Sequence, residues 1–337
     1  MTTLPRRPLL ALPALALPAL ALPALALPLV AAGRARAQGQ PWTVATEYPA
    51  SAIPGEGVAY FAAAIAARGI PATALPNGPE GYRSAAAFEA LSAGRFAVAD
   101  AFAGALAAAD PVFLLSSLPF LTAAPADAAR LRDLARPAYA AAAERRGAAL
   151  LWTTPWPPSG LWTRQPVTAP ADLRGLRVRT YDGTGTAVLR AAGAEAEPLS
   201  FAEVGARLAA GTLDAVLSSG DGGAGRRLWR WLPHFTEAGY AWPLSLAFAA
   251  APRLAALPPE GRAAVLAAAA DTEARQWGAI EGRLAANRRV MGENGVGIHA
   301  PTPALRAALR AAARDAIEAW RAGAGEAGRA ILAAYSG

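Results

Sequence analysis

Strand-like and helix-like segments alternate twice along this chain, and that alternation restricts the possible folds. Residues 42–46 (Trp-Thr-Val-Ala-Thr) have the apolar and polar alternation of a strand. Helical patterns follow at residues 55–68 and 82–93, and a short buried strand is predicted at residues 95–99. The order strand, helix, helix, strand predicts an α/β domain.

A strand predicted at residues 148–153 leads into a stiff, proline-rich crossing segment at residues 155–158, and a second alternation follows. Residues 172–180 are predicted to be a turn that feeds a strand, a further strand is predicted at residues 213–218, and helices are predicted at residues 187–192 and 200–211. Ser200 and Glu203 have the spacing of a capping box, in which each side chain satisfies a free amide of the first turn. The sequence therefore predicts a second α/β lobe.

Two long helices are predicted in the last third of the chain. The first spans residues 258–291, where Trp277, Ile280, Leu284 and Met291 form one apolar stripe. About 34 residues at 1.5 Å each would span roughly 50 Å, so this helix is expected to run across both lobes. The final helix begins with Thr302 as its cap and Pro303 in its first turn, and buries Leu305, Leu309, Ile317 and Trp320.

Residues 1–37 have the pattern of a secretory signal peptide. Arg6 and Arg7 precede an apolar run over residues 9–32, and Ala35-Arg36-Ala37 places small residues where a signal peptidase cleaves, before Gln38. A transmembrane helix is the alternative, but the four prolines of the run disfavour it. The twin arginines followed by Pro8-Leu9-Leu10 also resemble a twin-arginine export signal, so both export routes stay open. We expect a periplasmic mature protein.

The charge of the chain excludes a nucleic-acid function. The formal net charge is +7, and every basic residue is arginine, but four of the 32 arginines lie in the leader. The mature chain has 28 arginines against 25 acids, a net charge of +3, without the clustered basic face that DNA or RNA requires. The densest basic segment, residues 226–230, is interpreted as a solvated helix face.

Several kinds of enzyme site are also excluded. The chain has no cysteine, so it has no disulfide, thiolate zinc site or cysteine nucleophile. His234 and His299 are 65 positions apart without a partner at ligand spacing, so neither a metal nor another cofactor is expected. Gly183-Thr-Gly185 opens a helix after a strand, but Val188 stands where a dinucleotide fingerprint needs a small residue.

The order and spacing of several short motifs resemble one family. The motifs are Pro166-Val167, residues 171–179 (Ala-Asp-Leu-Arg-Gly-Leu-Arg-Val-Arg), Gly193-Ala194, residues 198–204 (Pro-Leu-Ser-Phe-Ala-Glu-Val) and residues 209–214. Further matches are Asp110-Pro111, residues 118–120, 257–260 and 295–298. Together they cover nearly the whole mature chain and resemble the dicarboxylate-receptor-type (DctP) solute-binding proteins of tripartite ATP-independent periplasmic (TRAP) transporters.

The resemblance implies a two-lobed periplasmic binding protein fold of type II-like architecture with a helix that spans both lobes. Residues 38–154 and about 246–285 would form lobe I, and residues 155–245 and about 286–337 lobe II. A small carboxylate would bind in the cleft and pass to the small and large membrane subunits. The protein would be a monomeric receptor without nucleic-acid partners, not an enzyme.

The resemblance also assigns binding residues. The family's signature arginine falls on Arg179, which would pair with the ligand carboxylate. The other matching positions are Asp182, Phe201, Ser218, Glu47, Ser84, Phe102, Tyr240 and Ser245. Members of the family that bind sugar acids carry a second arginine at a position that falls near Ser159 here. An asparagine common in the family is replaced by Ser218, so the ligands known for the family do not carry over.

Because the second arginine and the asparagine are missing, the pocket is expected to be more aromatic. Candidates for its walls are Phe102, Phe201, Trp156, Trp162 and Trp242. Two other functions stay open. One is an exported hydrolase with Asp182 or Glu47 as base, and the other is a receptor that signals to a sensor protein.

Overall fold

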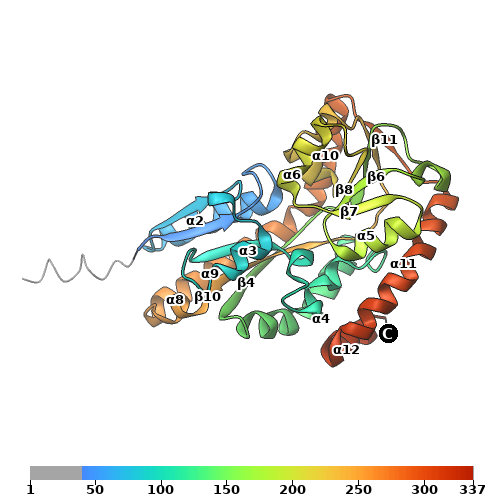
Figure 1. Ribbon diagram of the computed structural model, residues 1–337. Helices are drawn as coiled ribbons and strands as arrows, with labels where there is room; N and C mark the ends of the chain where they lie inside the picture. The colour runs from blue at the N-terminus through green and yellow to red at the C-terminus, as the bar shows by residue number, and fades with distance from the viewer. Residues whose placement is uncertain (1–39, 337) are drawn as a thin grey trace, which may run out of the picture. The chain divides into compact units, whose positions relative to one another are not determined.

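The computed structural model describes residues 40–336, and the predicted signal peptide lies outside this range. Two sheets organise the chain (Figure 1). The first contains, in spatial order, β2 (Ala72–Leu75), β1 (Trp42–Thr46), β3 (Val98–Phe102), β10 (Leu244–Ala250) and β4 (Ala148–Pro155). The second contains β11 (Gly297–His299), β9 (His234–Thr236), β5 (Ser159–Thr163), β8 (Ala215–Ser219), β6 (Arg177–Thr180) and β7 (Glu195–Pro198).

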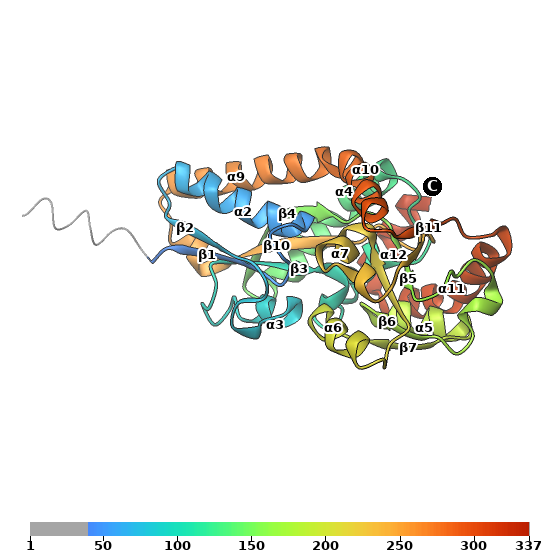
Figure 2. The same ribbon diagram turned by 90° about the horizontal axis from the view of Figure 1, so that it is seen from above.

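Helices cover both faces of the first sheet, which explains why its central strands are apolar on both sides. Figure 2 shows α2 (Ile53–Ala67) and α9 (Pro259–Gly278) side by side on one face and α3 (Ser84–Glu89) on the other. The first face buries Phe61, Trp152 and Val265 in one cluster. The opposite face packs α4 (Pro125–Glu144) and α12 (Gly325–Ser336) around Phe113 and Tyr139.

The second sheet is covered in the same way. On one side, α5 (Gly183–Ala191) and α11 (Pro303–Gly323) pack around Val178, Leu217 and Leu309. On the other, α6 (Phe201–Ala209) and α10 (Ile280–Glu293) contribute to the cluster that holds Trp162 and Phe235, where α7 (Gly220–Gly225) lies against α10. The remaining short elements are α8 (Ala251–Ala255), η1 (Pro79–Gly81), η2 (Ala103–Leu106), η3 (Pro111–Ser117), η4 (Pro170–Leu173) and η5 (Leu228–Arg230).

Two of the segments that cross between the sheets hydrogen-bond to each other. The predicted crossing at residues 155–158 leaves β4 and enters β5. From the sequence we also predict a return crossing near residues 244–247, which is wrong, because those residues already belong to β10 and pair with β3 and β4, so the crossing ends before Leu244. Trp156 N donates to Pro243 O at 2.9 Å, and Ser159 N to Ala241 O at 2.9 Å.

The predicted helix at residues 258–291 is two helices, α9 and α10, with Ala279 between them. Ala279 keeps right-handed helical angles (φ −82°, ψ −13°), so the chain continues from the first sheet to the second (Figure 2). Within the stripe, Ile280 and Met291 are buried and Trp277 and Leu284 partly buried. The expected long helix therefore exists, in two segments.

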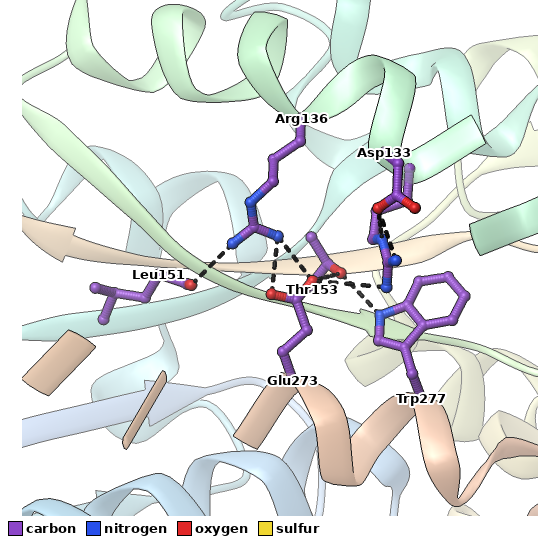
Figure 3. Close-up of polar contacts among 7 residues, drawn as sticks. Asp133, Arg136, Leu151, Thr153, Glu273 and Trp277 are labelled. Atoms are coloured by element: carbon purple, nitrogen blue, oxygen red, sulfur yellow. Dashed lines mark hydrogen bonds and ion pairs between the residues drawn. The ribbon is translucent and has the colours of Figure 1, made fainter. Parts of the chain in front are cut away.

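A polar network fixes α9 against the first sheet (Figure 3). Arg136 of α4 donates to both carboxylate oxygens of Glu273, at 2.7 and 2.8 Å. Thr153 of β4 donates to the same carboxylate at 2.6 Å and accepts from Trp277 Nε1 at 2.9 Å. The network thereby joins α9 to the consecutive elements α4 and β4, which lie far from it in the sequence.

Other boundaries differ from the prediction for local reasons. The strand predicted at residues 95–99 is β3 at Val98–Phe102, where pairing with β1 and β10 extends the apolar run through Asp100. Thr302 caps α11 as predicted, since its Oγ1 accepts from Leu305 N at 3.2 Å. A separate helix, α12, then packs on α4 of the first sheet, although residues 286–337 were expected with the second lobe. The lobe boundaries stay a prediction.

Within residues 40–336, none of the helices combines the length and apolarity that a membrane crossing requires.

Candidate functional site

Two adjoining cavities lie between the strand ends of the two sheets. The inner cavity encloses about 30 Å³ and the outer about 250 Å³, and both are lined by Tyr48, Phe102, Arg179, Tyr181 and Phe201. The inner one is also lined by Trp156, Ser159, Ser218, Ser219, Gly222 and Pro243, and the outer one by Glu47, Arg83, Ser84, Ala85, Ala105, Pro198, Leu199 and Ser200. Both sheets therefore contribute walls to one site.

Arg179 is the buried charge of this site. It lies near the end of β6 and is 4% exposed. Its Nε donates to Leu199 O at 2.8 Å and its Nη1 to Leu217 O at 3.3 Å. Among residues 40–336 no carboxylate forms an ion pair with it, so the guanidinium is held by carbonyl groups and not neutralised.

Burial lowers the pKa of Arg179 to about 10, because a charged group loses its hydration. The nearby Tyr48, Glu47, Tyr181 and Asp182 oppose this effect. The side chain still carries its charge at neutral pH. A desolvated cation without an acidic partner is most stable when an anion binds to it.

Phe201 provides an aromatic wall beside that cation. Its position follows from the predicted capping box, which is confirmed: Ser200 Oγ accepts from Ala202 N at 3.3 Å, and Glu203 accepts from Ser200 N at 3.1 Å. The guanidinium carbons of Arg179 and Arg226 lie 4.8 and 5.4 Å from the ring centroid, within cation–π range. Arg226 also donates to Glu47 O at 3.0 Å.

Glu47 is positioned in the outer cavity by Ser84. The Ser84 hydroxyl donates to the Glu47 carboxylate and accepts from Phe102 N at 2.9 Å. This chain of contacts ties the residue after β1 to the first turn of α3 and the end of β3. The other carboxylate oxygen can accept from a ligand N–H or O–H.

The floor of the inner cavity is aromatic and ordered by hydroxyl groups. Tyr48 and Trp156 have ring centroids 4.7 Å apart, and Trp156 Nε1 donates to Ser245 Oγ at 3.0 Å. Tyr181 OH donates to Ser159 Oγ at 3.2 Å, and its ring lies 5.0 Å from that of Phe102. The ring walls suit a flat or compact ligand.

Two buried aspartates lie near these walls. Asp182 caps α5 by accepting from Gly185 N at 2.7 Å, and burial raises its pKa to about 7. Asp100 of β3 accepts from Thr46 Oγ1 at 3.0 Å, and burial raises its pKa to about 8. Neither residue lines the two cavities, so Asp182, which was predicted to bind the ligand, lies behind the wall and caps α5.

The structure brings most of the predicted site residues together. Arg179, Phe201, Ser218, Ser159, Phe102, Glu47 and Ser84 line the cavities. Ser245 contacts Trp156 behind the wall, and Tyr240 is buried 6.5 Å from Tyr181. Trp162 is a core residue, packed 5.0 Å from Phe235 under Gly223, while Trp242 lines a separate cavity against α10.

Sequence reasoning missed Tyr48, Tyr181, Ser219 and Pro243. Tyr48 directly follows Glu47, and Tyr181 lies between Arg179 and Asp182, so their place beside matched positions was the available signal. No group of three or more histidine, cysteine or acidic side chains within residues 40–336 could hold a metal ion. The two histidines, although 65 positions apart in the sequence, are in contact.

One family of known proteins matches most of the chain. The family model described as bacterial extracellular solute-binding protein, family 7 (DctP), matches residues 55–322. Comparison with curated proteins finds no match.

Solved structures resemble the whole described chain. An extracytoplasmic solute receptor of Bordetella pertussis (DctP7) that binds pyroglutamic acid is 27% identical, with a TM-score of 0.84 over 89% of this chain and 100% of that one. A TRAP solute-binding protein of an unidentified marine microbe, specific for pyroglutamate, is 25% identical, with a TM-score of 0.83 over 88% and 98%. A galacturonate-bound TRAP protein of Sulfitobacter sp. NAS-14.1, 18% identical with a TM-score of 0.80 over 88% and 99%, shares the fold.

Proposed function

The chain belongs to family 7 of the bacterial extracellular solute-binding proteins, and we propose that it is the extracytoplasmic receptor of a TRAP transporter for a small organic acid. The receptor holds the ligand carboxylate in the cavity between the two sheets and delivers it to the membrane subunits. The three similar solved proteins described above are solute receptors that bind pyroglutamate or galacturonate, both carboxylates.

The observation that carries this proposal is the buried Arg179 without an acidic partner among residues 40–336. Its planar guanidinium can give two parallel, charge-assisted hydrogen bonds to a carboxylate. The two backbone carbonyls fix its orientation before a ligand arrives, which reduces the entropy lost on binding.

The walls favour a compact monocarboxylate that also carries a hydrogen-bond donor. Tyr48, Trp156, Tyr181 and Phe201 offer flat apolar surfaces on which a small ring can pack. Glu47 offers an acceptor to an N–H or O–H group of the same ligand. A lactam acid such as pyroglutamate, which two of the similar receptors bind, has both groups.

Binding would close the two sheet units around the ligand. The chain passes between the two sheets at residues 155–158, from β4 to β5, at residues 240–243, before β10, and again between α9 and α10 at Ala279. A ligand that contacts both units favours the closed form by its differential affinity. We further propose a periplasmic, monomeric protein that is released by cleavage before Gln38.

The enzyme and sensor alternatives make different predictions. Asp182 caps α5 and lines neither cavity, so it would lie away from the ligand as a hydrolase base, whereas Glu47 keeps one oxygen for a ligand in the outer cavity, so ligand conversion has to be tested directly. A sensor receptor would bind the same ligand but work without the TRAP membrane subunits.

Calorimetric titration tests the proposal. Refolded, ligand-free protein is titrated with pyroglutamate, a panel of small carboxylic acids, and the corresponding amides as uncharged controls. We expect one site that prefers an acid to its amide, and recovery of the ligand unchanged after long incubation. Equal affinity for acid and amide, or conversion of the ligand, would contradict the proposal. Uptake in membranes with and without the membrane subunits separates transport from sensing.

A further inference from the structure

The only two histidines of the 337-residue chain meet at the edge of the second sheet. His234 begins β9 and His299 ends β11, the edge strand that pairs in parallel with β9. His234 Nδ1 lies 3.1 Å from His299 Nε2, and the ring planes are inclined by 46°. Neither ring lines the two ligand cavities, so the proposed receptor function does not use this pair.

The strand register explains how the rings reach each other. Gly297 is the partner of His234, and His299 is the partner of Thr236, so His299 lies two positions further along the same face. A Cβ at position 297 would lie 2.9 Å from His234 Nδ1 and 3.0 Å from His299 Nε2. The glycine therefore leaves the space in which the two nitrogens face each other.

The spacing of the two nitrogens suits coordination of one metal ion. Imidazole nitrogens bind Zn²⁺ at about 2.0–2.1 Å. Two nitrogens 3.1 Å apart would then subtend about 95° at the metal, between octahedral and tetrahedral angles. Rotation about the broad χ2 torsions can direct both lone pairs to that point.

The surroundings are compatible with a cation. Both rings are only half-buried, which leaves the remaining coordination positions to water. The nearby Glu237 is bound by Arg288 through two hydrogen bonds, at 2.7 and 2.9 Å.

We propose that His234 and His299 form a two-histidine site for a late divalent transition metal, which links edge strand β11 to β9. A site of two imidazole ligands without a carboxylate prefers Cu²⁺, Ni²⁺ and Zn²⁺ to Mg²⁺ or Ca²⁺. Copper binds most strongly, as expected for nitrogen ligands. The bound ion stabilises the folded chain, because the two ligands are 65 residues apart and face each other only after folding.

The test uses tag-free full-length protein and the metals alone. Zn²⁺ is titrated by calorimetry in a non-coordinating buffer at pH 7.5, and Cu²⁺ is followed by electron paramagnetic resonance. We expect one ion per chain and a copper spectrum with two imidazole nitrogens. Each of His234→Gln and His299→Gln should weaken Zn²⁺ binding at least about tenfold, since even changes behind a ligand reduce affinity by 10–100-fold.

Two further variants separate chelation from chance binding. Gly297→Ala keeps both histidines but places a Cβ between the nitrogens, so it should also lose the site, whereas Glu237→Gln should stay within threefold of wild type. The melting temperature should rise with Zn²⁺ in the wild type but not in His234→Gln. Binding that survives the double replacement of both histidines, or is lost equally in Glu237→Gln, overturns the proposal. None of these measurements involves the carboxylate ligand.

Discussion

The guanidinium carbon of Arg179 lies 4.8 Å from the centroid of the Phe201 ring, so the buried cation and the aromatic wall of the cavity form one unit. Arg179 comes from β6 of the second sheet and Phe201 from the first turn of α6. The carbonyl of Leu199, two residues before Phe201, accepts from Arg179 Nε at 2.8 Å. The capping turn therefore holds both the cation and its aromatic neighbour in place.

Replacing Arg179 should abolish most of the carboxylate affinity. Arg179→Ala leaves the ligand carboxylate desolvated and unpaired, which costs about 2–5 kcal/mol of binding free energy. Binding should therefore weaken roughly thirty- to several-thousand-fold. Arg179→Lys should restore only part of it, because an ammonium keeps the charge but loses the planar fork. Calorimetry measures both variants. Arg177→Ala is the matched control, since Arg177 lies on the same strand but pairs with Asp214. Affinity within threefold of wild type in a folded Arg179→Ala would contradict the carboxylate mechanism.

Replacing Phe201 by leucine should weaken binding less. Leucine keeps an apolar side chain but removes the ring face next to Arg179 and Arg226. A cation–π contact contributes about 0.5–2 kcal/mol, so a roughly two- to thirtyfold loss of affinity is expected. Phe235→Leu serves as the control, because Phe235 packs on Trp162 in the core. This substitution should lower the melting temperature without changing the ligand affinity. Equal ligand affinities of Phe201→Leu and Phe235→Leu would contradict a role of the Phe201 ring in ligand binding.

Asp221 should control closure of the two sheet units. It is 2% exposed on α7, and its carboxylate accepts from Ile53 N of α2 at 2.9 Å and from Arg283. Asp221→Asn removes the charge that holds these elements together, so the open population should rise and ligand affinity fall about three- to thirtyfold.

Small-angle scattering checks this prediction. The ligand-free variant should have a larger radius of gyration than wild type, and saturating ligand should reduce it. Glu56→Gln is the control, because Glu56 also pairs with Arg283, at 2.6 Å, but is more exposed than Asp221. The substitution should therefore change the ligand affinity little. An unchanged radius in Asp221→Asn would exclude Asp221 as the link.

Asp100 should make stability fall as pH rises. Its pKa is raised to about 8 by burial, whereas an unfolded aspartate titrates near 3.9. Between these values the folded chain binds a proton that the unfolded chain does not, so the free energy of unfolding decreases with pH. From pH 5 to pH 8.5 the wild type should lose more than about 1 kcal/mol relative to Asp100→Asn. Urea unfolding at both pH values measures this, and parallel pH profiles would refute it.

Export should remove the predicted signal peptide. We expect a mature chain that begins at or near Gln38, because a charged start, an apolar run and Ala35-Arg36-Ala37 precede it. Mass spectrometry of the native protein checks the N-terminus. A mature mass that includes Met1 would contradict cleavage, and export through the twin-arginine route should be lost when Arg6 and Arg7 are replaced by lysine.

Local patterns in the sequence were sufficient to predict most elements and the family motifs. The alternation of apolar segments identified β1, α2, β4 and α11, and the spacing of Ser200 and Glu203 identified the start of α6, because these features depend on neighbours within one turn or strand. The motif at residues 171–179 similarly indicated Arg179 as the candidate anchor, and this side chain is buried at the cavity.

The set of side chains that share a cavity depends instead on tertiary packing. Trp162 and Trp156 were equivalent candidates, yet Trp162 packs under Gly223 in the core and Trp156 lines the ligand cavity. The contact between His234 and His299 depends on the register of β9 and β11, and α12 packs on α4 across almost 200 residues. Register and packing partners are set by contacts between distant segments, and local periodicity carries no information on which segments meet.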